Sequence, residues 1–378
     1  MRITIVQGAF LPVPPLRGGA IEKAFYALAQ EFASLGHSVF YISRHCDGLP
    51  EIEEESPNLK HCRIKGYDAP KSSFIYKFLD FLYSQRVYRN LPHADILVTH
   101  TFWLPILARN PLEHGNVYVH VGRVPKGQMR LYQHVARLQT VSSTIVEKIK
   151  REVPKTKASK LSLVHYPLSP EFLKEPMASL HKEKVILYAG RIHPEKGIGL
   201  LIRAFLSITK EKRLGWHLHI LGPWKTQQGG GGEEFLMSLQ ELSGSNSDIQ
   251  FQEPIFGQLE LISAFDKASI FVYPSLAEKG ETFGLSALEA MARRCVTLVS
   301  SLSCFKDFVE DGENGYVFNH RGESPEGILS GVLLRLIENI DQLDDIRESA
   351  RRTALDYSVE NISQQFLDDF HQILRNEC

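Results

Sequence analysis

Short apolar runs rich in β-branched residues alternate along the chain with longer segments whose apolar residues recur at helical spacing. This alternation is typical of a parallel α/β sheet, because each buried strand is followed by a helix that returns the chain to the same side of the sheet. The strands predicted in the first half are residues 2–7, 38–43, 95–100, 116–121, 137–142 and 160–165. Those predicted in the second half are residues 184–190, 216–222, 248–253, 268–275, 295–300 and 315–318. The pattern predicts two doubly wound α/β domains.

A polar stretch with three prolines, residues 166–184, separates the two series. Prolines without apolar periodicity favour a linker. We therefore predict an N-terminal domain, a linker, a C-terminal domain and a C-terminal helix, with the bounds 1–168, 169–183, 184–356 and 357–378.

Composition narrows the class of protein. The chain has 378 residues, of which 43% are hydrophobic and 23% charged, enough for two cores. A formal net charge of −1 gives no overall field that would attract nucleic acid. The five cysteines are widely spaced and form no CxxC pair, which indicates neither a disulfide framework nor a zinc site. No run approaches the roughly 20 apolar residues of a membrane span, and a cytoplasmic protein is expected.

Ligands of open α/β sheets bind beyond the carboxyl ends of strands, so the loops after strands are the candidate sites. The first such loop contains Gly18 and Gly19 and leads into a helix with Glu22 in its first turn. Paired glycines let the backbone approach a ligand, and the helix start offers free N–H groups to an anion. A glycine pair before a helix is, by itself, more often ordinary turn chemistry than a binding loop. The spacing GxGxxG is missing, which argues against an NAD-dependent oxidoreductase.

The second loop, in "YAGRIHPEKG", carries Arg191 and Lys196 directly before a predicted helix. Two cations at a helix start are able to neutralise a diphosphate without a metal. The alternative is a pair of solvated surface cations.

The third loop, in "ETFGLSALEA", places Glu281 in a loop and Glu289 on the following helix. Carboxylates accept hydrogen bonds from sugar and ribose hydroxyls, and N–H groups near Phe283 and Gly284 would face phosphate or sugar oxygens. The alternative is that Glu281 only stabilises the helix N-terminus and that Glu289 lies on a solvated face of the helix.

Together, "AGRIHPEKG" and "ETFGLSALEA" closely resemble the donor-site signature of retaining glycosyltransferases of family 4. "PPLRGGAIEKAF", "DILVTHTFWLP", "YVHVGR", "TVSS" and "DFVEDGENGYVF" resemble further segments of that family, so the resemblance covers almost the whole chain. It implies the GT-B fold, in which two Rossmann-like domains face each other across a cleft and the last helix crosses back to the first domain.

The resemblance also implies roles for single residues on the donor side. Arg191 and Lys196 would bind and stabilise the leaving diphosphate. Glu281 would contact the donor sugar and Glu289 the ribose. Backbone contacts to the donor would come from Phe283, Gly284 and Leu285.

On the N-terminal side, Gly18 and Gly19 would lie near the phosphates, with Glu22 supporting their loop. His120, in "YVHVG", would lie beside the reacting sugar; His100 and His193 are weaker candidates. The cations Arg123, Lys126 and Arg130 would either contact an acceptor phosphate or lie on a solvated face.

The chain departs from the family pattern in one donor-side loop. Ser303 and Cys304 occupy positions where many relatives have two glycines, and Asp307 occupies the acidic position. The conformation of that loop does not follow from the resemblance.

The function that the resemblance implies is transfer of a sugar from a nucleotide-diphosphate donor to a hydroxyl of a glycan or lipid-linked acceptor, with retention and without metal or other cofactor. Surface glycan assembly of the bacterial type is the expected setting. The alternatives are a nucleotide-sugar epimerase of GT-B architecture and a non-catalytic nucleotide-sugar-binding protein.

Residues 72–90 mix aromatic side chains with Lys77, Arg86 and Arg89, which suits either a peripheral membrane contact or a core-packed helix. Nucleobase, sugar, acceptor and oligomeric state do not follow from the sequence.

Overall fold

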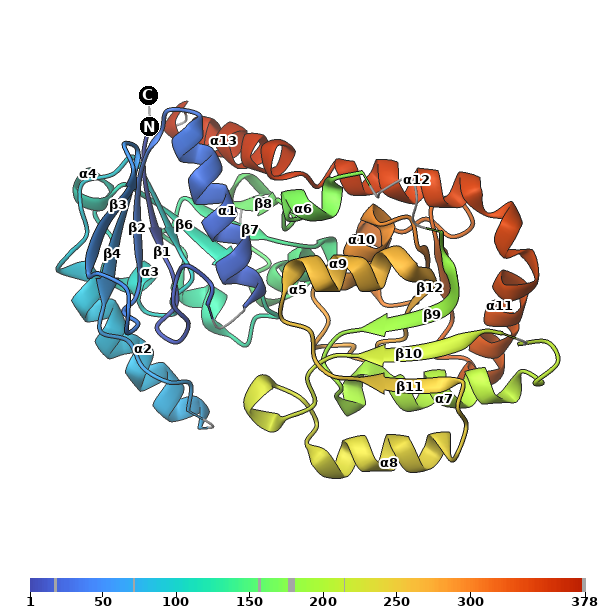
Figure 1. The fold of residues 1–378 in the computed structure, drawn as a ribbon. Coiled ribbons are helices and arrows are strands. Elements are labelled where there is room, and N and C mark those ends of the chain that lie inside the picture. Colours follow the sequence, from blue (N-terminus) through green and yellow to red (C-terminus); the bar gives the residue numbers. More distant parts are fainter. Residues whose placement is uncertain (17–18, 71, 156–157, 176–180, 214, 376–378) are drawn as a thin grey trace. The chain divides into compact units, whose positions relative to one another are not determined.

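The computed structural model describes residues 1–378 except 17–18, 71, 156–157, 176–180, 214 and 376–378. The chain forms two compact units, each an α/β sheet with its own helices (Figure 1). Unit 1 comprises Met1–Pro167 together with Val359–Cys378, and unit 2 comprises Leu168–Ser358. Residues 176–180 of the predicted linker lie outside the described residues.

The sheet of unit 1 has eight strands in the order β3-β4-β2-β1-β5-β6-β7-β8, all parallel except β3, which is antiparallel to β4. The strands are β1 (Arg2–Val6), β2 (Ser38–Arg44), β3 (Ile52–Ser56), β4 (Leu59–Ile64), β5 (Ile96–Thr99), β6 (Asn116–Val121), β7 (Arg137–Thr140) and β8 (Leu161–Leu163). The helices are α1 (Ala20–Ser34), α2 (Ser73–Tyr88), α3 (Leu104–Leu107), α4 (Pro111–His114), α5 (Ser143–Glu152) and α13 (Val359–Arg375), with the 3₁₀ turns η1 (Gln128–Leu131) and η2 (Ala158–Lys160).

Strands β3 and β4 were not predicted from the sequence. The reason is their position: β3, "IEEES", lies at the edge of the sheet and is largely exposed, so its residues are charged rather than apolar. An edge strand of this kind has no apolar run for the pattern to detect.

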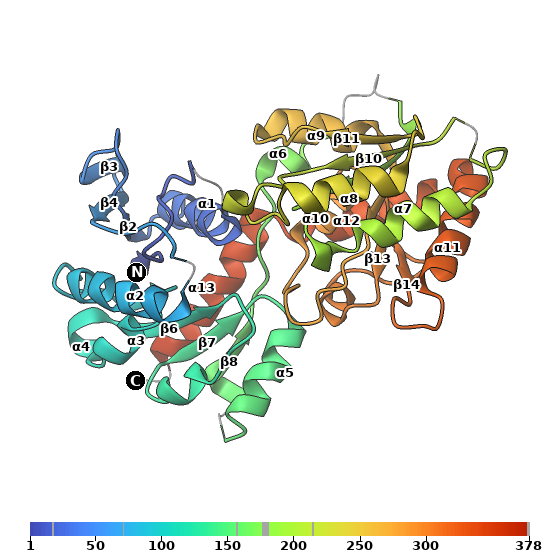
Figure 2. The ribbon, with the colours of Figure 1, turned by 90° about the horizontal axis from the view of Figure 1, so that it is seen from below.

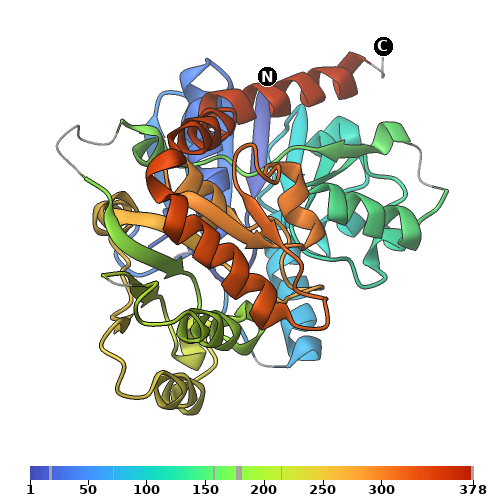
Figure 3. The same ribbon diagram turned by 90° about the vertical axis from the view of Figure 1, so that its right-hand side faces the viewer.

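The last helix, α13, belongs to unit 1 and packs against α1 (Figures 1 and 3). Its buried apolar residues recur every three or four positions, as expected for one apolar face. Phe366 of that face contacts Phe25 and Phe32 of α1, with ring centroids 5.7 and 6.4 Å apart. Helix α2 packs against α3 (Figure 2).

The sheet of unit 2 has six parallel strands in the order β11-β10-β9-β12-β13-β14. They are β9 (Glu183–Ala189), β10 (His217–Leu221), β11 (Ile249–Gln252), β12 (Ala268–Tyr273), β13 (Val296–Ser300) and β14 (Tyr316–Phe318). The helices are α6 (Pro170–Leu173), α7 (Ile198–Ser207), α8 (Glu233–Ser243), α9 (Gln258–Lys267), α10 (Leu285–Ala292), α11 (Pro325–Asn339) and α12 (Asp344–Leu355). The 3₁₀ turns are η3 (Pro194–Lys196), η4 (Thr226–Gln228), η5 (Ser303–Asp307) and η6 (Ile340–Gln342).

In both sheets the order in which strands are added reverses beside the first strand of the unit. In unit 1, β1 lies between β2 and β5, and in unit 2, β9 lies between β10 and β12. Helices therefore cover both faces: α7 contacts α8 and α11, whereas α10 contacts α6 and α12 (Figure 1). The loops that leave the two strands at such a switch point are the usual place for a ligand.

Candidate functional site

In unit 2, the loops that follow β9 and β12 are in direct contact at the switch point. The N–H of Leu276 donates to the carbonyl oxygen of Glu195 at 2.8 Å. Gly197 has a φ of 71°, and a Cβ at this position would lie 2.0 Å from the carbonyl oxygen of Pro274. Glycine is needed here because any side chain would force the two loops apart.

These two loops bring Lys196 and Glu281 together. Lys196 Nζ lies 2.6 Å from Glu281 Oε2, and the two side chains are only 6% and 9% exposed. The ammonium group also lies over the ring of Tyr273, 5.3 Å from its centroid. An ion pair so far removed from water interacts strongly with any further charge that enters the site.

Arg191 lies on the same loop as Lys196 but is 44% exposed at its side chain. Its Nη1 donates to the carbonyl oxygen of Gly229 at 2.6 Å, and its Nη2 donates to Glu195 Oε1 at 3.1 Å. The glycine-rich segment is attached to the same loop, because the N–H of Gly231 donates to the carbonyl oxygen of Ile192 at 2.8 Å. Arg191 is thus held at the surface of the loop by two partners.

The rest of the third motif forms the start of α10. Gly284 caps the helix with a φ of 85°, and a Cβ there would lie 2.3 Å from the ring of Phe305. Phe283 is buried against Phe308, with ring centroids 5.3 Å apart. Leu285 begins the helix, and Glu289 lies within it, partly exposed. Glu281 therefore lies in the loop and Glu289 on the helix.

The loop with the unusual Ser303 and Cys304 forms the 3₁₀ turn η5, which ends at Asp307. Cys304 is 1% exposed, and burial, followed by the negative charges of Glu281 and Asp307, raises the pKa of its thiol. Cys304 thus belongs to the wall beside Glu281 as a neutral thiol.

In unit 1, the first glycine loop is described only in part, because Gly18 lies outside the described residues. Gly19 precedes α1 with a φ of 99°, and a Cβ there would lie 2.0 Å from Glu22 Oε2. The Glu22 side chain therefore folds back over the start of its own helix. Glu22 is 9% exposed, and burial raises the pKa of its carboxyl group.

His120, at the end of β6, is buried and hydrogen-bonded at both ring nitrogens. Its Nδ1 lies 2.6 Å from Gln139 Oε1, and its Nε2 lies 3.0 Å from the Tyr166 hydroxyl. The Gln139 amide nitrogen donates to the carbonyl oxygen of Val164, which directs the accepting oxygen toward the histidine. Nδ1 must then carry the proton, and Nε2 accepts from Tyr166. Burial lowers the pKa of His120 to about 4, so the ring is neutral near pH 7.

The two weaker histidine candidates have local partners. His100 Nδ1 lies 3.0 Å from the carbonyl oxygen of Val6, and burial, followed by His120, lowers its pKa well below the ordinary value. His193 caps η3, its Nδ1 accepting the N–H of Glu195 at 3.4 Å.

The cations Arg123, Lys126 and Arg130 are exposed in the segment that follows β6. Arg123 is close enough to Glu22 for its charge to lower the pKa of that carboxyl group, although burial has the larger, opposite effect. Of the three, Arg123 is therefore the one that the structure relates to the first glycine loop.

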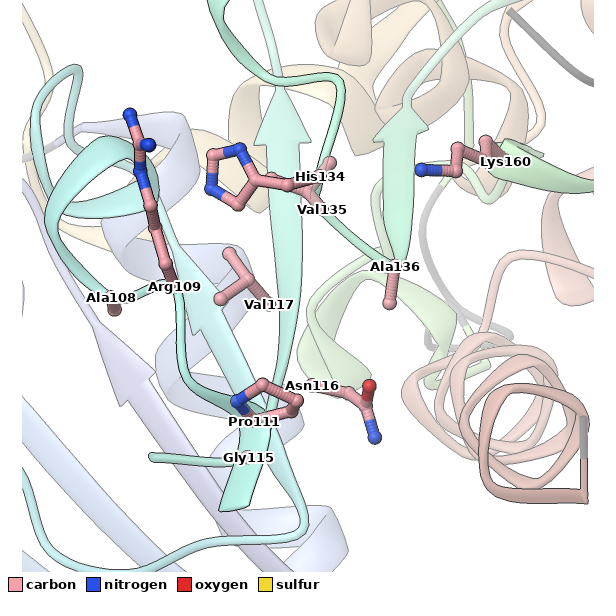
Figure 4. Close-up of a pocket in the computed structure, with 10 residues that line it drawn as sticks. All are labelled: Ala108, Arg109, Pro111, Gly115, Asn116, Val117, His134, Val135, Ala136 and Lys160. Carbon is pink, nitrogen blue, oxygen red and sulfur yellow. The ribbon is translucent and has the colours of Figure 1, made fainter. Parts of the chain in front are cut away.

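A cavity of about 170 Å³ lies elsewhere in unit 1, near the amino ends of β6 and β7 (Figure 4). His134 and Lys160 line it, and both side chains are bonded to backbone oxygens, of Pro105 and Gln133 respectively. His120 lies at the opposite, carboxyl end of β6, so this cavity is separate from the candidate site.

Sequence reasoning missed several residues of the unit 2 site. Tyr273 lies beneath the ammonium group of Lys196, Glu195 holds Arg191, and Phe305 covers Gly284. The strand run containing Tyr273 was recognised, but an aromatic residue inside an apolar run carries no signal of a site. Among the described residues, no group of three or more histidine, cysteine, aspartate or glutamate side chains is arranged to hold a metal ion.

Comparison with known proteins relates the second unit to one family of enzymes. Residues 171–353 match the model of the family described as glycosyl transferases group 1. A lipopolysaccharide 1,2-N-acetylglucosaminetransferase of Salmonella typhimurium (strain LT2) is 26% identical over 382 aligned residues, which cover 94% of each chain.

Solved structures share the fold over nearly the whole length. A sucrose-phosphate synthase from Thermosynechococcus elongatus superposes with a TM-score of 0.81 at 18% identity, covering 99% of both chains. Anabaena Alr3699/HepE in complex with UDP and glucose gives a TM-score of 0.71 at 14% identity, covering 98% of this chain and 100% of that one. The protein therefore has the GT-B fold, as predicted, and the segment of its second unit that matches the glycosyl transferases group 1 model is residues 171–353.

Proposed function

We propose that this protein is a glycosyltransferase that moves a sugar from a nucleotide-diphosphate donor to a hydroxyl of a glycan or lipid-linked acceptor. The observation that carries the proposal is the buried Lys196–Glu281 pair at the switch point of a glycosyltransferase group 1 domain. The lysine supplies positive charge for a diphosphate, and the glutamate supplies an acceptor for sugar hydroxyls in the same place.

Lys196 and Arg191 would act on the leaving group. As the bond between the anomeric carbon and the diphosphate oxygen breaks, negative charge grows on the phosphate, and fixed cations in a water-poor site stabilise that charge. Arg191 would exchange its bonds to Gly229 and Glu195 for phosphate oxygens. We propose that these two side chains make a divalent metal unnecessary.

Retention of configuration is part of the proposal. The acceptor hydroxyl would attack the anomeric carbon on the face from which the diphosphate leaves, forming the new carbon–oxygen bond. The hydroxyl proton would pass to the departing phosphate, so no enzyme nucleophile is required. Glu281 would hold donor-sugar hydroxyls and Glu289 the ribose, with backbone contacts from Phe283, Gly284 and Leu285.

We assign acceptor binding to the carboxyl edge of unit 1. There His120 is neutral, and a neutral ring suits hydrogen bonding to a sugar hydroxyl better than a fixed charge does. Arg123 is the cation best placed to meet an acceptor phosphate, with Lys126 and Arg130 further along the same exposed segment. The lipopolysaccharide-modifying relative supports an acceptor used in surface glycan assembly.

The first test is thermal stability with UDP, GDP, ADP, dTDP and CMP, each with and without EDTA. A ligand that binds only the folded state raises Tm. We expect one diphosphate to raise Tm equally with and without the chelator, and UDP is the first choice because a structural neighbour binds it. A shift abolished by EDTA would refute the metal-independent site.

Transfer assays then separate the candidate activities. Turnover of the matching nucleotide sugar that requires an acceptor would support the transferase. Conversion of the sugar without an acceptor would identify an epimerase, and binding without any turnover would identify a non-catalytic protein. The anomeric configuration of the product tests retention directly.

We further propose that α2 contacts an anionic lipid surface. Its first turns expose Phe74, Ile75 and Phe78, which are 80%, 47% and 53% exposed. The only acidic residue in this helix, Asp80, is buried and accepts the N–H groups of Phe102 and Trp103. Exposed apolar residues combined with cations such as Lys77 favour the interface of a negatively charged membrane. None of the described helices is long and apolar enough to cross a bilayer.

Vesicle sedimentation tests this contact. We expect binding to phosphatidylcholine vesicles that also contain phosphatidylglycerol, weaker binding at high salt, and a several-fold loss in the Phe74→Ser/Phe78→Ser variant. Leu112→Ser is the matched control, since Leu112 is 82% exposed on α4 in the same unit. Equal binding by both variants would overturn the assignment.

A further inference from the structure

A group of polar side chains in unit 2 joins the loop that carries Glu281 to the ends of two neighbouring strands. Glu278 comes from the loop after β12, Ser301 follows β13, and His320 and Arg321 follow β14. We call these four residues the Glu278 clamp. Glu278, His320 and Arg321 lie outside the motifs recognised in the sequence.

The bonds of the clamp form a closed network. Arg321 donates to both carboxylate oxygens of Glu278, through Nε at 2.7 Å and Nη2 at 2.9 Å. Its remaining Nη1 donates to the carbonyl oxygen of Ser301 at 3.0 Å. His320 Nε2 lies 3.0 Å from Glu278 Oε1, and its Nδ1 lies 3.1 Å from the Ser301 hydroxyl. The hydrogen bonds from Arg321 lower the pKa of Glu278, which keeps the carboxylate ionised near pH 7.

The Glu278 clamp contacts the loop after β12 on one side, and a second hydrogen bond attaches the same loop to the loop of Lys196. Leu276, two residues before Glu278, bonds to Glu195 in the loop of Lys196. Glu281 lies three residues after Glu278, and its N–H donates to the carbonyl oxygen of Ala277 at 2.9 Å. The position of the Glu281 carboxylate therefore depends on a short turn that is held at both ends.

We propose that Arg321 is a positioning residue for the donor site, which acts by fixing Glu278 and thereby the turn that presents Glu281 to Lys196. The expected effect on the donor site rests on the proposed function, whereas the holding of the turn by Arg321 and Glu278 does not. A bidentate arginine–carboxylate pair defines orientation as well as distance, which a lysine at the same position would not do.

The chain contains a matched ion pair that lacks this connection. Arg203 of α7 bonds to Glu326 of α11 at 2.9 Å, and these side chains are 48% and 41% exposed. The Arg321–Glu278 pair is 47% and 52% exposed. Exposed ion pairs of this kind contribute little to stability, so the two arginine variants should be equally well folded. Only the Arg321 variant should disturb the donor site.

Two measurements test the inference. Hydrogen exchange of the amides in residues 275–283 should become faster in Arg321→Ala but not in Arg203→Ala, with Arg321→Lys intermediate. The dissociation constant of UDP, measured by calorimetry, should rise about tenfold in Arg321→Ala and be unchanged in Arg203→Ala, because small displacements of positioning groups have large effects on binding geometry. A charge-preserving Arg321→Lys variant should recover part of the affinity.

The outcomes separate the two ideas. Unchanged exchange in residues 275–283 of Arg321→Ala would overturn the clamp, whatever the nucleotide results are. Faster exchange together with unchanged UDP affinity would also overturn the positioning role and leave only a structural one. If wild-type protein binds none of the nucleoside diphosphates, the proposed function fails, while the exchange measurement still decides whether the clamp holds the turn.

Discussion

At the carboxyl edge of the unit 2 sheet, Lys196 and Glu281 form a buried ion pair at 2.6 Å, whereas at the corresponding edge of unit 1 the buried histidines carry no charge. His120 is fixed by Gln139 and Tyr166, and His100 is bonded to Val6. One edge holds a buried ion pair, and the other holds buried neutral histidines. The same fold has thus produced two chemically different edges.

The difference follows from the partners that each loop can reach. In unit 2, the loops after β9 and β12 touch, so a lysine and a glutamate 85 residues apart in sequence form an ion pair. In unit 1, the hydrogen-bond partners of His120 are an amide and a hydroxyl, and that of His100 Nδ1 is a backbone carbonyl. Burial without an opposite charge favours the neutral form of a titratable group. Under the proposed function, the first edge would take the diphosphate and the second the hydroxyl-bearing acceptor.

The largest effect is expected from Lys196→Met. Removal of the cation at the leaving group should reduce transfer by about two to three orders of magnitude, since electrostatic stabilisation of developing charge is commonly worth that much. Measured turnover of the matching nucleotide sugar tests this. Near-wild-type transfer would contradict the role of Lys196.

Stability must be controlled in that experiment, because Lys196→Met leaves the Glu281 carboxylate buried without its partner. Breaking a buried pair costs about 3–5 kcal/mol. The double variant Lys196→Met/Glu281→Gln removes both charges and should regain Tm while remaining inactive. Recovery of activity with Tm would show that the lysine is only structural.

A smaller loss, about tenfold to a hundredfold in turnover, is expected for Arg191→Ala. Its exposed guanidinium acts in a wetter environment than Lys196, and charge interactions are weaker there. Arg191→Lys, which keeps the charge, should be less impaired. A loss as large as that of Lys196→Met would contradict the ranking of the two cations.

Glu289→Gln should weaken binding of the nucleoside diphosphate by about tenfold, because hydrogen bonds to a charged group are worth more than those to a neutral one. Calorimetric titration of the wild type and the variant measures the difference. Glu326→Gln, on α11 of the same unit, is the control. An unchanged dissociation constant would refute the ribose contact.

The smallest effect is expected for the pH dependence of stability, through His120 of unit 1. The pKa of His120 is lowered from the ordinary 6.5 to about 4 in the folded state, so the unfolded chain binds its proton first as the solution becomes acidic. The stability that the neutral ring contributes is therefore present above pH 6.5 and is lost as the pH falls toward 4. His120→Gln should show a shallower decline of Tm over this interval.

His371→Gln, which replaces an exposed histidine of α13, is the control for that measurement and should decline as the wild type does. A decline in His120→Gln as steep as in the wild type would mean that the buried ring does not couple to acid unfolding.

Much of the fold could be predicted from the apolar pattern. Each predicted apolar run contains a strand, because a buried parallel strand needs a continuous apolar segment. Strand β3 escaped prediction because it is an exposed edge strand, and β4 because Lys60, His61 and Arg63 interrupt its apolar residues although most of it is buried. Helix α2 was predicted with two alternatives open, and its exposed first turns depart from a fully core-packed helix. The site roles carried over from the resemblance stay predictions.

The sequence by itself determined where the strands other than β3 and β4 run, which loops follow them, and which charged residues those loops carry, since these depend on local pattern and on motifs. Only the tertiary structure decided which of those charges meet. Lys196 pairs with Glu281, whereas Arg191 bonds to Glu195 and Gly229, and Glu278 is held by His320 and Arg321 from beyond β14. The physical reason is that ionisation state and orientation depend on burial and on partners distant in sequence, which are set by strand order and loop contact rather than by the residues themselves.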